Sequence, residues 1–166
     1  MQRFATLLFT LLLAFVVQVQ AQDKAPDKAP DKAAAATSDA EQIKQTALDY
    51  IEGFYEGDAA RMERALHPEL AKRIVNTDER GRSVFNHMGA MRLVQLTRVS
   101  SGKDIPKEKQ QKDVTVLDIF GNAASAKIIA AEWIDYLHLA KWNGKWVIIN
   151  VLWELKPKPP AASTTP

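Results

Sequence analysis

The sequence predicts an α+β fold in which three amino-terminal helices pack on an antiparallel sheet. Two observations carry this prediction. Apolar residues recur at helical spacing from residue 43 onward, whereas after Val114 the pattern changes to apolar runs separated by Gly121-Asn122 and Asn143-Gly144. An Asn-Gly pair between two apolar runs is among the strongest local signals for a β-hairpin.

The first two helices are marked at their ends. Ser38 and Glu41 form a capping box, in which each side chain satisfies a free backbone N–H at the start of a helix. An apolar stripe follows, made of Ile43, Ala47, Tyr50, Ile51 and Phe54. Gly57 ends this helix by adopting the left-handed conformation, and Asp58 caps a shorter second helix that ends at His67-Pro68.

The middle of the chain is less clearly patterned. Residues 69–84 are compatible with a short helix or a strand, followed by a turn at Gly81. A third helix is predicted from about Phe85 to Val99, and a charged loop covers residues 103–112.

Three strands are predicted at about 113–120, 124–141 and 145–155. With Asn143 and Gly144 at the centre of the turn, Leu139 pairs with Ile148, Asp135 with Leu152, and Tyr136 with Val151. This register places Ile129, Trp133, Asp135 and Asn150 on one face, and Ile128, Tyr136, His138 and Trp153 on the other. Both faces are largely apolar, so both need a cover. The helices can cover one, and we expect a second subunit on the other, which predicts a homodimer through the sheet.

The two ends of the chain differ from this domain. Residues 1–21 combine Arg3, an apolar run and Val19-Gln20-Ala21, as in a cleavable signal peptide. The alternative is a membrane anchor, but the run is too short for a span of about 20 residues, so no stable span is expected after cleavage. We therefore expect export, either to the periplasm or out of the cell. The linker of residues 22–37, with its Asp-Lys-Ala-Pro repeats, and the proline-rich tail of residues 156–166 should stay extended, which leaves a domain at 38–155.

Composition excludes several classes of partner. The chain has no cysteine, and therefore no disulfide, thiolate metal site or cysteine nucleophile. Loss of residues 1–21 removes only Arg3, so the 22 basic residues become 21 against 20 acidic ones. Near-neutral charge argues against nucleic acid or an anionic membrane as partner. No phosphate-binding or flavin motif is present, so no cofactor is expected.

Two stretches carry a resemblance to a known family. The run Tyr55-x-Gly57-Asp58-x-x-x-Met62-x-x-x-Leu66-His67-Pro68-Glu69 resembles the junction of the first two helices in the nuclear transport factor-like superfamily. The run from Trp133 to Trp153 looks like its putative lumazine-binding branch. The resemblance implies a cone-shaped roll, with a strongly curved sheet and a pocket at the wide end. Superfamily relatives include isomerases, dehydratases and proteins without activity, so it implies no particular reaction.

Asp135 is the strongest candidate for chemistry, because it interrupts an apolar strand face. Burial could make it a general base in a pocket, or it could form an ion pair with a helix lysine or arginine, or lie at a wet rim. Tyr136 and His138 share the opposite face, where they could shuttle a proton or simply pack in a dimer interface.

A second group of residues is predicted to line the pocket. His67 could either meet the free carbonyls at the end of its helix or lie at the pocket mouth. The tryptophans are also natural core anchors. The three histidines are scattered, and no metal site is expected. The predicted lining residues are His67, Trp133, Asn150, Trp153, Tyr50 and Phe54.

Three hypotheses for function follow from these residues. The preferred one is a non-catalytic dimeric domain that binds a small hydrophobic or aromatic molecule in its pocket. The second is an enzyme of the isomerase or dehydratase type with Asp135 as general base. The third is a purely structural dimer whose cone is filled by side chains.

Overall fold

The computed structural model describes residues 37–99 and 102–157 and confirms the α+β class. The helices are α1 (Asp39–Glu56), α2 (Ala59–Ala65) and α3 (Ala90–Val99), with two short 3₁₀ helices, η1 (Gly102–Asp104) and η2 (Lys107–Lys109). The strands are β1 (Leu66–Thr77), β2 (Ser83–Gly89), β3 (Lys112–Phe120), β4 (Ala123–Ala130), β5 (Trp133–Trp142) and β6 (Lys145–Leu155). The expected signal peptide, linker and carboxy-terminal tail fall almost wholly outside the described residues.

The predicted ends of α1 and the predicted start of α2 are confirmed, whereas α2 ends at Ala65, before the expected stop at His67-Pro68, because the chain is already extended in β1 from Leu66. The Ser38 hydroxyl accepts the backbone N–H of Glu41, and the Glu41 carboxylate accepts the backbone N–H of Ser38. Gly57 closes α1 with φ 67°, a left-handed conformation that costs glycine little. The Asp58 carboxylate then caps α2 by accepting the N–H of Arg61.

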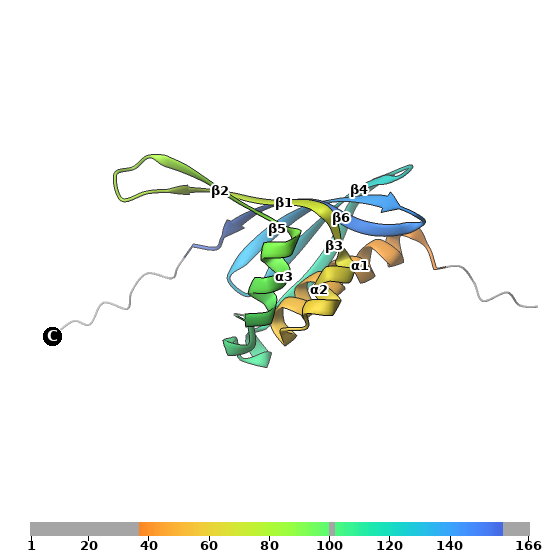
Figure 1. The fold of residues 1–166 in the computed structure, drawn as a ribbon, viewed down its shortest axis with the longest axis horizontal. Helices are drawn as coiled ribbons and strands as arrows, with labels where there is room; N and C mark the ends of the chain where they lie inside the picture. The colour runs from red at the N-terminus through yellow and green to blue at the C-terminus, as the bar shows by residue number, and fades with distance from the viewer. Residues whose placement is uncertain (1–36, 100–101, 158–166) are drawn as a thin grey trace, which may run out of the picture. The chain divides into compact units, whose positions relative to one another are not determined.

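All six strands form a single sheet in the order β2-β1-β6-β5-β4-β3, and the helices lie on one side of it (Figure 1). β1 runs parallel to β6, while every other neighbouring pair is antiparallel. The sheet is therefore mixed, not antiparallel as predicted, because β1 leaves α2 alongside the last strand of the chain. The sheet is also not strongly curled, which corrects the expected curvature.

Two elements differ from their predicted boundaries. Residues 66–89 form a hairpin of β1 and β2 around a turn in which Asp78 and Arg82 are hydrogen-bonded and Gly81 has φ 74°. The third helix consequently begins at Ala90 and not at Phe85. The long strand expected at 124–141 is two strands, because the chain turns at Ala131 and Glu132.

A β-bulge at Ile149 changes the predicted register of β5 and β6. Leu139 pairs with Ile148 as expected, but His138 pairs with Asn150 and Asp135 with Trp153. Tyr136 consequently pairs with Leu152 instead of Val151. A one-residue shift moves a side chain to the other face of a sheet. Trp153 thus joins Asp135 on the face that the helices cover, while Asn150 lies on the open face.

The assignment of β4 to the two faces was also wrong. Ile128 pairs with Asp135 and is fully buried beneath the helices, whereas Ile129 pairs with Ile134. The reason is the turn at Ala131 and Glu132, which breaks the alternation that an unbroken strand would have kept.

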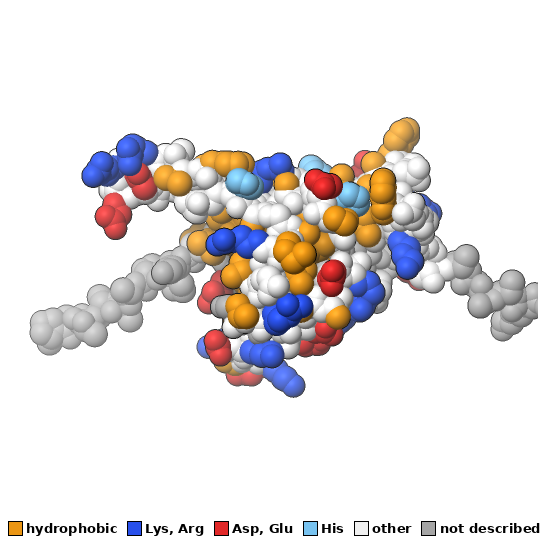
Figure 2. Space-filling model, viewed as in Figure 1, with side chains coloured by type: hydrophobic (Ala, Val, Ile, Leu, Met, Phe, Trp, Pro, Cys, Tyr) orange, Lys and Arg blue, Asp and Glu red, His pale blue; other side chains and the backbone are white. Residues whose placement is uncertain are grey.

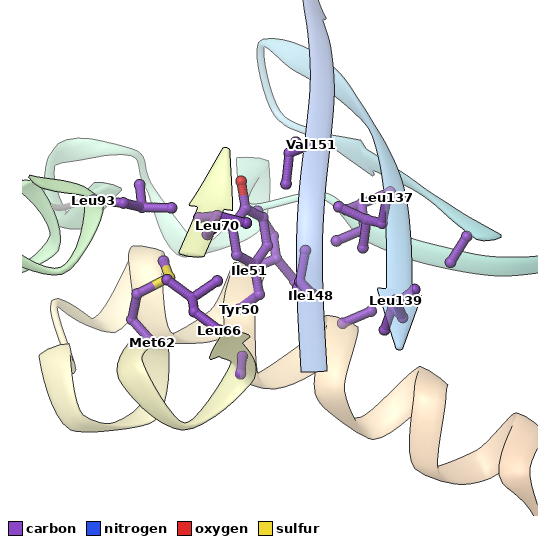
Figure 3. Close-up of a cluster of buried hydrophobic side chains, with 14 of the residues drawn as sticks. Tyr50, Ile51, Met62, Leu66, Leu70, Leu93, Leu137, Leu139, Ile148 and Val151 are labelled. Atoms are coloured by element: carbon purple, nitrogen blue, oxygen red, sulfur yellow. The ribbon is translucent and has the colours of Figure 1, made fainter. Parts of the chain in front are cut away.

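The core lies between α1 and the middle of the sheet (Figure 3). Each fully buried aliphatic side chain contributes about 1.5–3 kcal/mol relative to the exposed side chain. Met62 of α2 and Leu93 of α3 extend the core to the other two helices. The fully buried apolar side chains include Ile43, Ile51, Met62, Ile128, Leu137, Leu139, Ile148 and Val151.

The opposite face of the sheet has no cover within the chain described. In Figure 2 hydrophobic and histidine side chains lie next to each other along the top of the molecule, where this face begins. Tyr136 and Leu152 are cross-strand neighbours there and are about half exposed. The polar chain Arg73–Asn150–His138 lies beside them. Among the described residues, no helix has the length and apolar character that a membrane span requires.

Candidate functional site

A cavity of about 340 Å³ lies beneath the covered face of the sheet. Its wall is almost entirely apolar and aromatic, with contributions from all three helices and from four strands. The lining residues are Tyr50, Ile51, Phe54, Met62, Lys72, Met88, Leu93, Leu96, Trp133, Trp153 and Leu155. A pocket of this size and composition is typical of small-molecule sites.

Simple local rules bring these side chains together. Tyr50 and Phe54 are four residues apart on α1, so they share one face of the helix. Lys72 of β1 is the direct neighbour of Met88 on β2 and of Val151 on β6, so it points to the covered face with them. The Phe54 ring meets the Trp133 ring edge-on, with the ring centres 5.4 Å apart.

One corner of the cavity is polar and is built around Lys72. Its Nζ donates to Asp135 Oδ1 at 2.5 Å and to the Tyr50 hydroxyl at 2.6 Å. The other carboxylate oxygen of Asp135 accepts the indole N–H of Trp133 at 2.7 Å. Asp135 is fully buried and Lys72 nearly so, which makes this a desolvated ion pair with both charges hydrogen-bonded. Figure 3 shows the Tyr50 oxygen pointing away from α1.

Burial shifts the proton affinities in this corner. Burial, reinforced by the nearby charge of Asp135, raises the pKa of the Tyr50 phenol well above its usual value. Burial also lowers the pKa of the Lys72 ammonium, although the carboxylate of Asp135 opposes this effect. Tyr50 is therefore a neutral phenol at physiological pH, and the corner combines one hydroxyl with one internally balanced ion pair.

Two donors in this region have no hydrogen-bond acceptor among the described residues. Lys72 carries three N–H groups, of which two are used, and its Nζ lies 4.8 Å from the ring centre of Trp153. The indole nitrogen of Trp153 is buried without a partner in the same set of residues. The cavity wall thus has one spare donor, on Lys72, whereas the Trp153 nitrogen is closed off from solvent and from the cavity.

The candidate catalytic residues are divided between the two faces. Asp135 is on the covered face, but both its oxygens are engaged and it does not line the cavity. Tyr136 and His138 lie on the open face, where His138 Nδ1 is 3.3 Å from the side-chain nitrogen of Asn150. The structure therefore does not bring Asp135 together with Tyr136 or His138.

Of the six residues expected to line a pocket, four line the cavity and two lie elsewhere. Tyr50, Phe54, Trp133 and Trp153 line the cavity. Asn150 does not, because the bulge turns it to the open face. His67 also lies elsewhere: its ring packs edge-on against Trp142, and its Nδ1 accepts the backbone N–H of Glu69.

Lys72 is the residue that the sequence analysis missed. A partner for Asp135 was expected from a helix, but it comes from β1. Leu70, Lys72 and Ile74 alternate along this strand, and all three are buried. A lysine between two apolar residues at strand spacing was the available signal, and the uncertain assignment of residues 69–84 concealed it.

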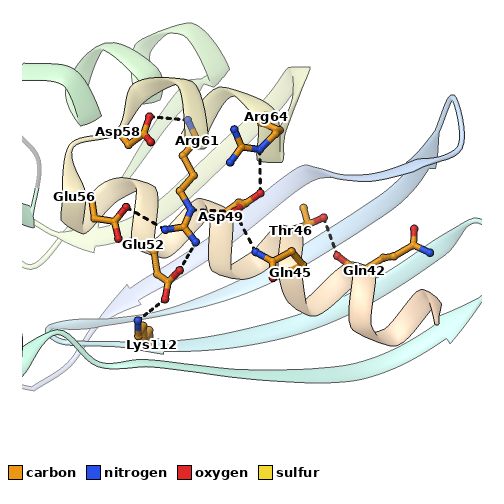
Figure 4. Close-up of polar contacts among 10 residues, drawn as sticks. All are labelled: Gln42, Gln45, Thr46, Asp49, Glu52, Glu56, Asp58, Arg61, Arg64 and Lys112. Carbon is orange, nitrogen blue, oxygen red and sulfur yellow. Dashed lines mark hydrogen bonds and ion pairs between the residues drawn. The ribbon is translucent and has the colours of Figure 1, made fainter. Parts of the chain in front are cut away.

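A second charged cluster lies between α1 and α2 (Figure 4). Arg61 of α2 forms ion pairs with Asp49, Glu52 and Glu56 of α1, and Lys112 of β3 pairs with Glu52. Hydrogen bonds from Arg61 and Arg64 outweigh burial and lower the pKa of Asp49. This cluster joins α1 to α2 and to β3.

Within residues 37–99 and 102–157, no group of three histidine or carboxylate side chains could hold a metal ion.

Comparisons with known proteins agree with this architecture. Residues 38–154 match the model of a family described as putative lumazine-binding. A comparison with curated protein sequences finds no match.

Solved structures are similar in fold. An NTF2-like protein of unknown function from Methylobacillus flagellatus is 24% identical, with 74% of this chain and 97% of that chain covered and a TM-score of 0.57. One from Shewanella baltica is 20% identical, with coverages of 71% and 94% and a TM-score of 0.53. An NTF2-like protein with a cystatin-like fold from Novosphingobium aromaticivorans is 13% identical, with coverages of 74% and 84% and a TM-score of 0.53.

Proposed function

We propose, from the premise that this chain belongs to the putative lumazine-binding family of NTF2-like domains, that it binds one small, largely aromatic molecule in its cavity. The resemblance predicted from the sequence is thereby confirmed at the level of family and fold. The proposal is for a binding module without catalytic activity of its own.

The cavity itself carries this proposal. It is wide enough for a small ring system, and the edges and faces of Phe54, Trp133 and Trp153 give it the apolar surface that flat molecules prefer. Asp135, the candidate general base, already accepts from Lys72 and from Trp133. Because both of its oxygens are engaged, Asp135 is better suited to hold Lys72 in place than to take a proton from a bound molecule.

Native mass spectrometry of the protein purified from its own host tests the proposal. We expect a fraction of the folded chains to retain one molecule, and added lumazine or 2-acetylnaphthalene to bind with one-to-one stoichiometry. Leu96→Trp should abolish binding because it fills the cavity. Gln95→Trp, which adds the same ring to the exposed neighbouring position, should leave binding intact. The proposal fails if no molecule is retained and neither probe binds at millimolar concentration.

We also propose that two copies associate through the open face of the sheet. Support comes from the half-exposed Tyr136 and Leu152, which lie together on a face that the helices leave uncovered. Light scattering at micromolar concentration should give twice the chain mass. Leu152→Lys should give the monomer mass, because it places a charge in the middle of this patch. A monomer in the unmodified protein contradicts this proposal and leaves the cavity proposal untouched.

Export remains a proposal from residues 1–36, which lie outside the described residues. Cleavage after Ala21 predicts that the protein from its own host begins at Gln22. Intact-mass measurement decides this, since retention of residues 1–21 would contradict the proposal.

A further inference from the structure

We propose that the cavity selects an uncharged molecule that offers a hydrogen-bond acceptor, such as a ring carbonyl or ring nitrogen, to Lys72. The inference deepens the proposed binding function and rests on it. It concerns which aromatic molecules the cavity accepts and which it rejects.

The first step is the hydrogen-bonding character of the wall. Lys72 is the only residue lining the cavity, among those that the structure describes, whose side chain carries a charge. Two of its three N–H groups are donated to Asp135 and to Tyr50, and the third has no acceptor among the described residues. An ammonium offers donors alone. A ligand that satisfies it must therefore bring an acceptor.

The second step is the charge balance of the corner. Lys72 and Asp135 are joined at 2.5 Å, and both are removed from water. Their charges cancel before any ligand arrives. A carboxylate or phosphate beside Lys72 would also lie near the carboxylate of Asp135, and the cavity would then hold an unbalanced negative charge in apolar surroundings. A neutral acceptor avoids this penalty and still receives a charge-assisted hydrogen bond.

The third step concerns the shape of the ligand. The Trp153 ring lines the cavity with its apolar carbon surface, since its indole nitrogen is fully buried. The indole N–H of Trp133 donates its hydrogen bond to Asp135 and is not available to a ligand. The remaining wall is apolar. These features together favour a flat ring system with an acceptor on the edge that faces Lys72.

Three probes of matched shape test this inference by equilibrium dialysis at pH 7. They are 2-acetylnaphthalene, 2-ethylnaphthalene and 2-naphthoate, which differ in a carbonyl, an alkyl group and a carboxylate. We expect the ketone to bind about tenfold more tightly than the ethyl compound, the usual advantage of a hydrogen bond from a charged donor. We expect 2-naphthoate to bind at least about tenfold more weakly than the ketone.

Variants of the ion pair give the sharper test. Asp135→Asn leaves the Lys72 charge without a counterion, so the preference should reverse in favour of 2-naphthoate. Lys72→Met should remove the advantage of the ketone over the ethyl compound. Since Lys72→Met strands a buried carboxylate, the double variant Lys72→Met/Asp135→Asn provides the same readout in a chain with no buried charge at this position. Far-UV circular dichroism checks the fold of each variant.

Each outcome has a distinct meaning. Tighter binding of 2-naphthoate than of the ketone to the unmodified protein overturns the inference, as does equal binding of the ketone and the ethyl compound. In both cases the proposed binding function survives. Absence of a reversal in Asp135→Asn overturns the charge-balance argument. If none of the three probes binds, the inference falls, and the proposed function falls with it if native mass spectrometry also finds no retained molecule.

Discussion

Removing one partner of the Lys72–Asp135 pair should destabilise the domain far more than removing both. Lys72→Met leaves the Asp135 carboxylate with a single donor, the indole N–H of Trp133, at a position with no exposure to solvent. The variant therefore keeps a buried charge and loses the cation that balanced it.

The size of the effect follows from this burial. Breaking a buried ion pair by removing one partner costs about 3–5 kcal/mol in the free energy of unfolding. With a slope of about 2 kcal/mol per molar urea, the midpoint should fall by on the order of 2 M. Lys72→Met/Asp135→Asn carries no charge there and keeps an amide oxygen for Trp133. We expect the double variant to recover at least about 2 kcal/mol of the loss.

Urea unfolding followed by far-UV circular dichroism measures these differences. Lys112→Met is the matched control, because Lys112 also pairs with a carboxylate, that of Glu52, but its side chain is half exposed. Its loss should stay below about 1 kcal/mol. The reasoning is refuted if Lys72→Met costs no more than Lys112→Met, or if the double variant is no more stable than Lys72→Met.

Three further perturbations have expected outcomes. Burial raises the folded-state pKa values of Asp49 and Glu52, but hydrogen bonds outweigh it and lower both: those from Arg61, Arg64 and Gln45 at Asp49, and those from Lys112 and Arg61 at Glu52. The stabilisation from these two carboxylates is therefore present above about pH 4 and is lost as the pH falls through the lowered values. Arg61→Met should therefore lose less stability than the parent as the pH falls below about 4. An equal loss would contradict the role given to Arg61 in lowering these pKa values. Burial raises the pKa of Tyr50, so the stability that its neutral phenol provides is present below about pH 10 and is lost at higher pH. In thermal melts, the melting temperature of Tyr50→Phe should therefore fall less between pH 9 and pH 11 than that of the parent. An equal fall would argue against this reasoning. Gly144 has φ 77°, and Gly144→Ala should cost about 1–2 kcal/mol in chemical denaturation, whereas Gly89→Ala, which has no positive φ and no close contact, should be neutral or slightly stabilising.

Features set by neighbouring residues could be predicted from the sequence. The capping box at Ser38 and the left-handed Gly57 define the ends of α1 locally, without help from the rest of the chain. The turn at Asn143 and Gly144 is equally local, and both residues adopt the positive φ that it requires. The apolar stripe of α1 also placed Tyr50 and Phe54 on the side where the cavity lies.

Features set by distant contacts could not be predicted. Six of the seven residues of β2 are exposed, so the alternation that marks a half-buried strand is missing there. The parallel pairing of β1 with β6 depends on how the chain returns after α2, which no local pattern records. The bulge at Ile149 has no glycine or proline to mark it, so the face of Trp153 could not be read from an unbroken alternation.

The bulge also governs how this domain can be compared with its relatives. On the carboxy-terminal side of Ile149, the residues that reach the interior are Val151 and Trp153. Without the extra residue in the bulge, Asn150 and Leu152 would reach the interior instead. A single misplaced gap in an alignment would therefore exchange interior and exterior along the second half of β6. Equivalent pocket residues in other family members should be located by counting backward from the Asp135–Trp153 pair, not forward from the hairpin turn.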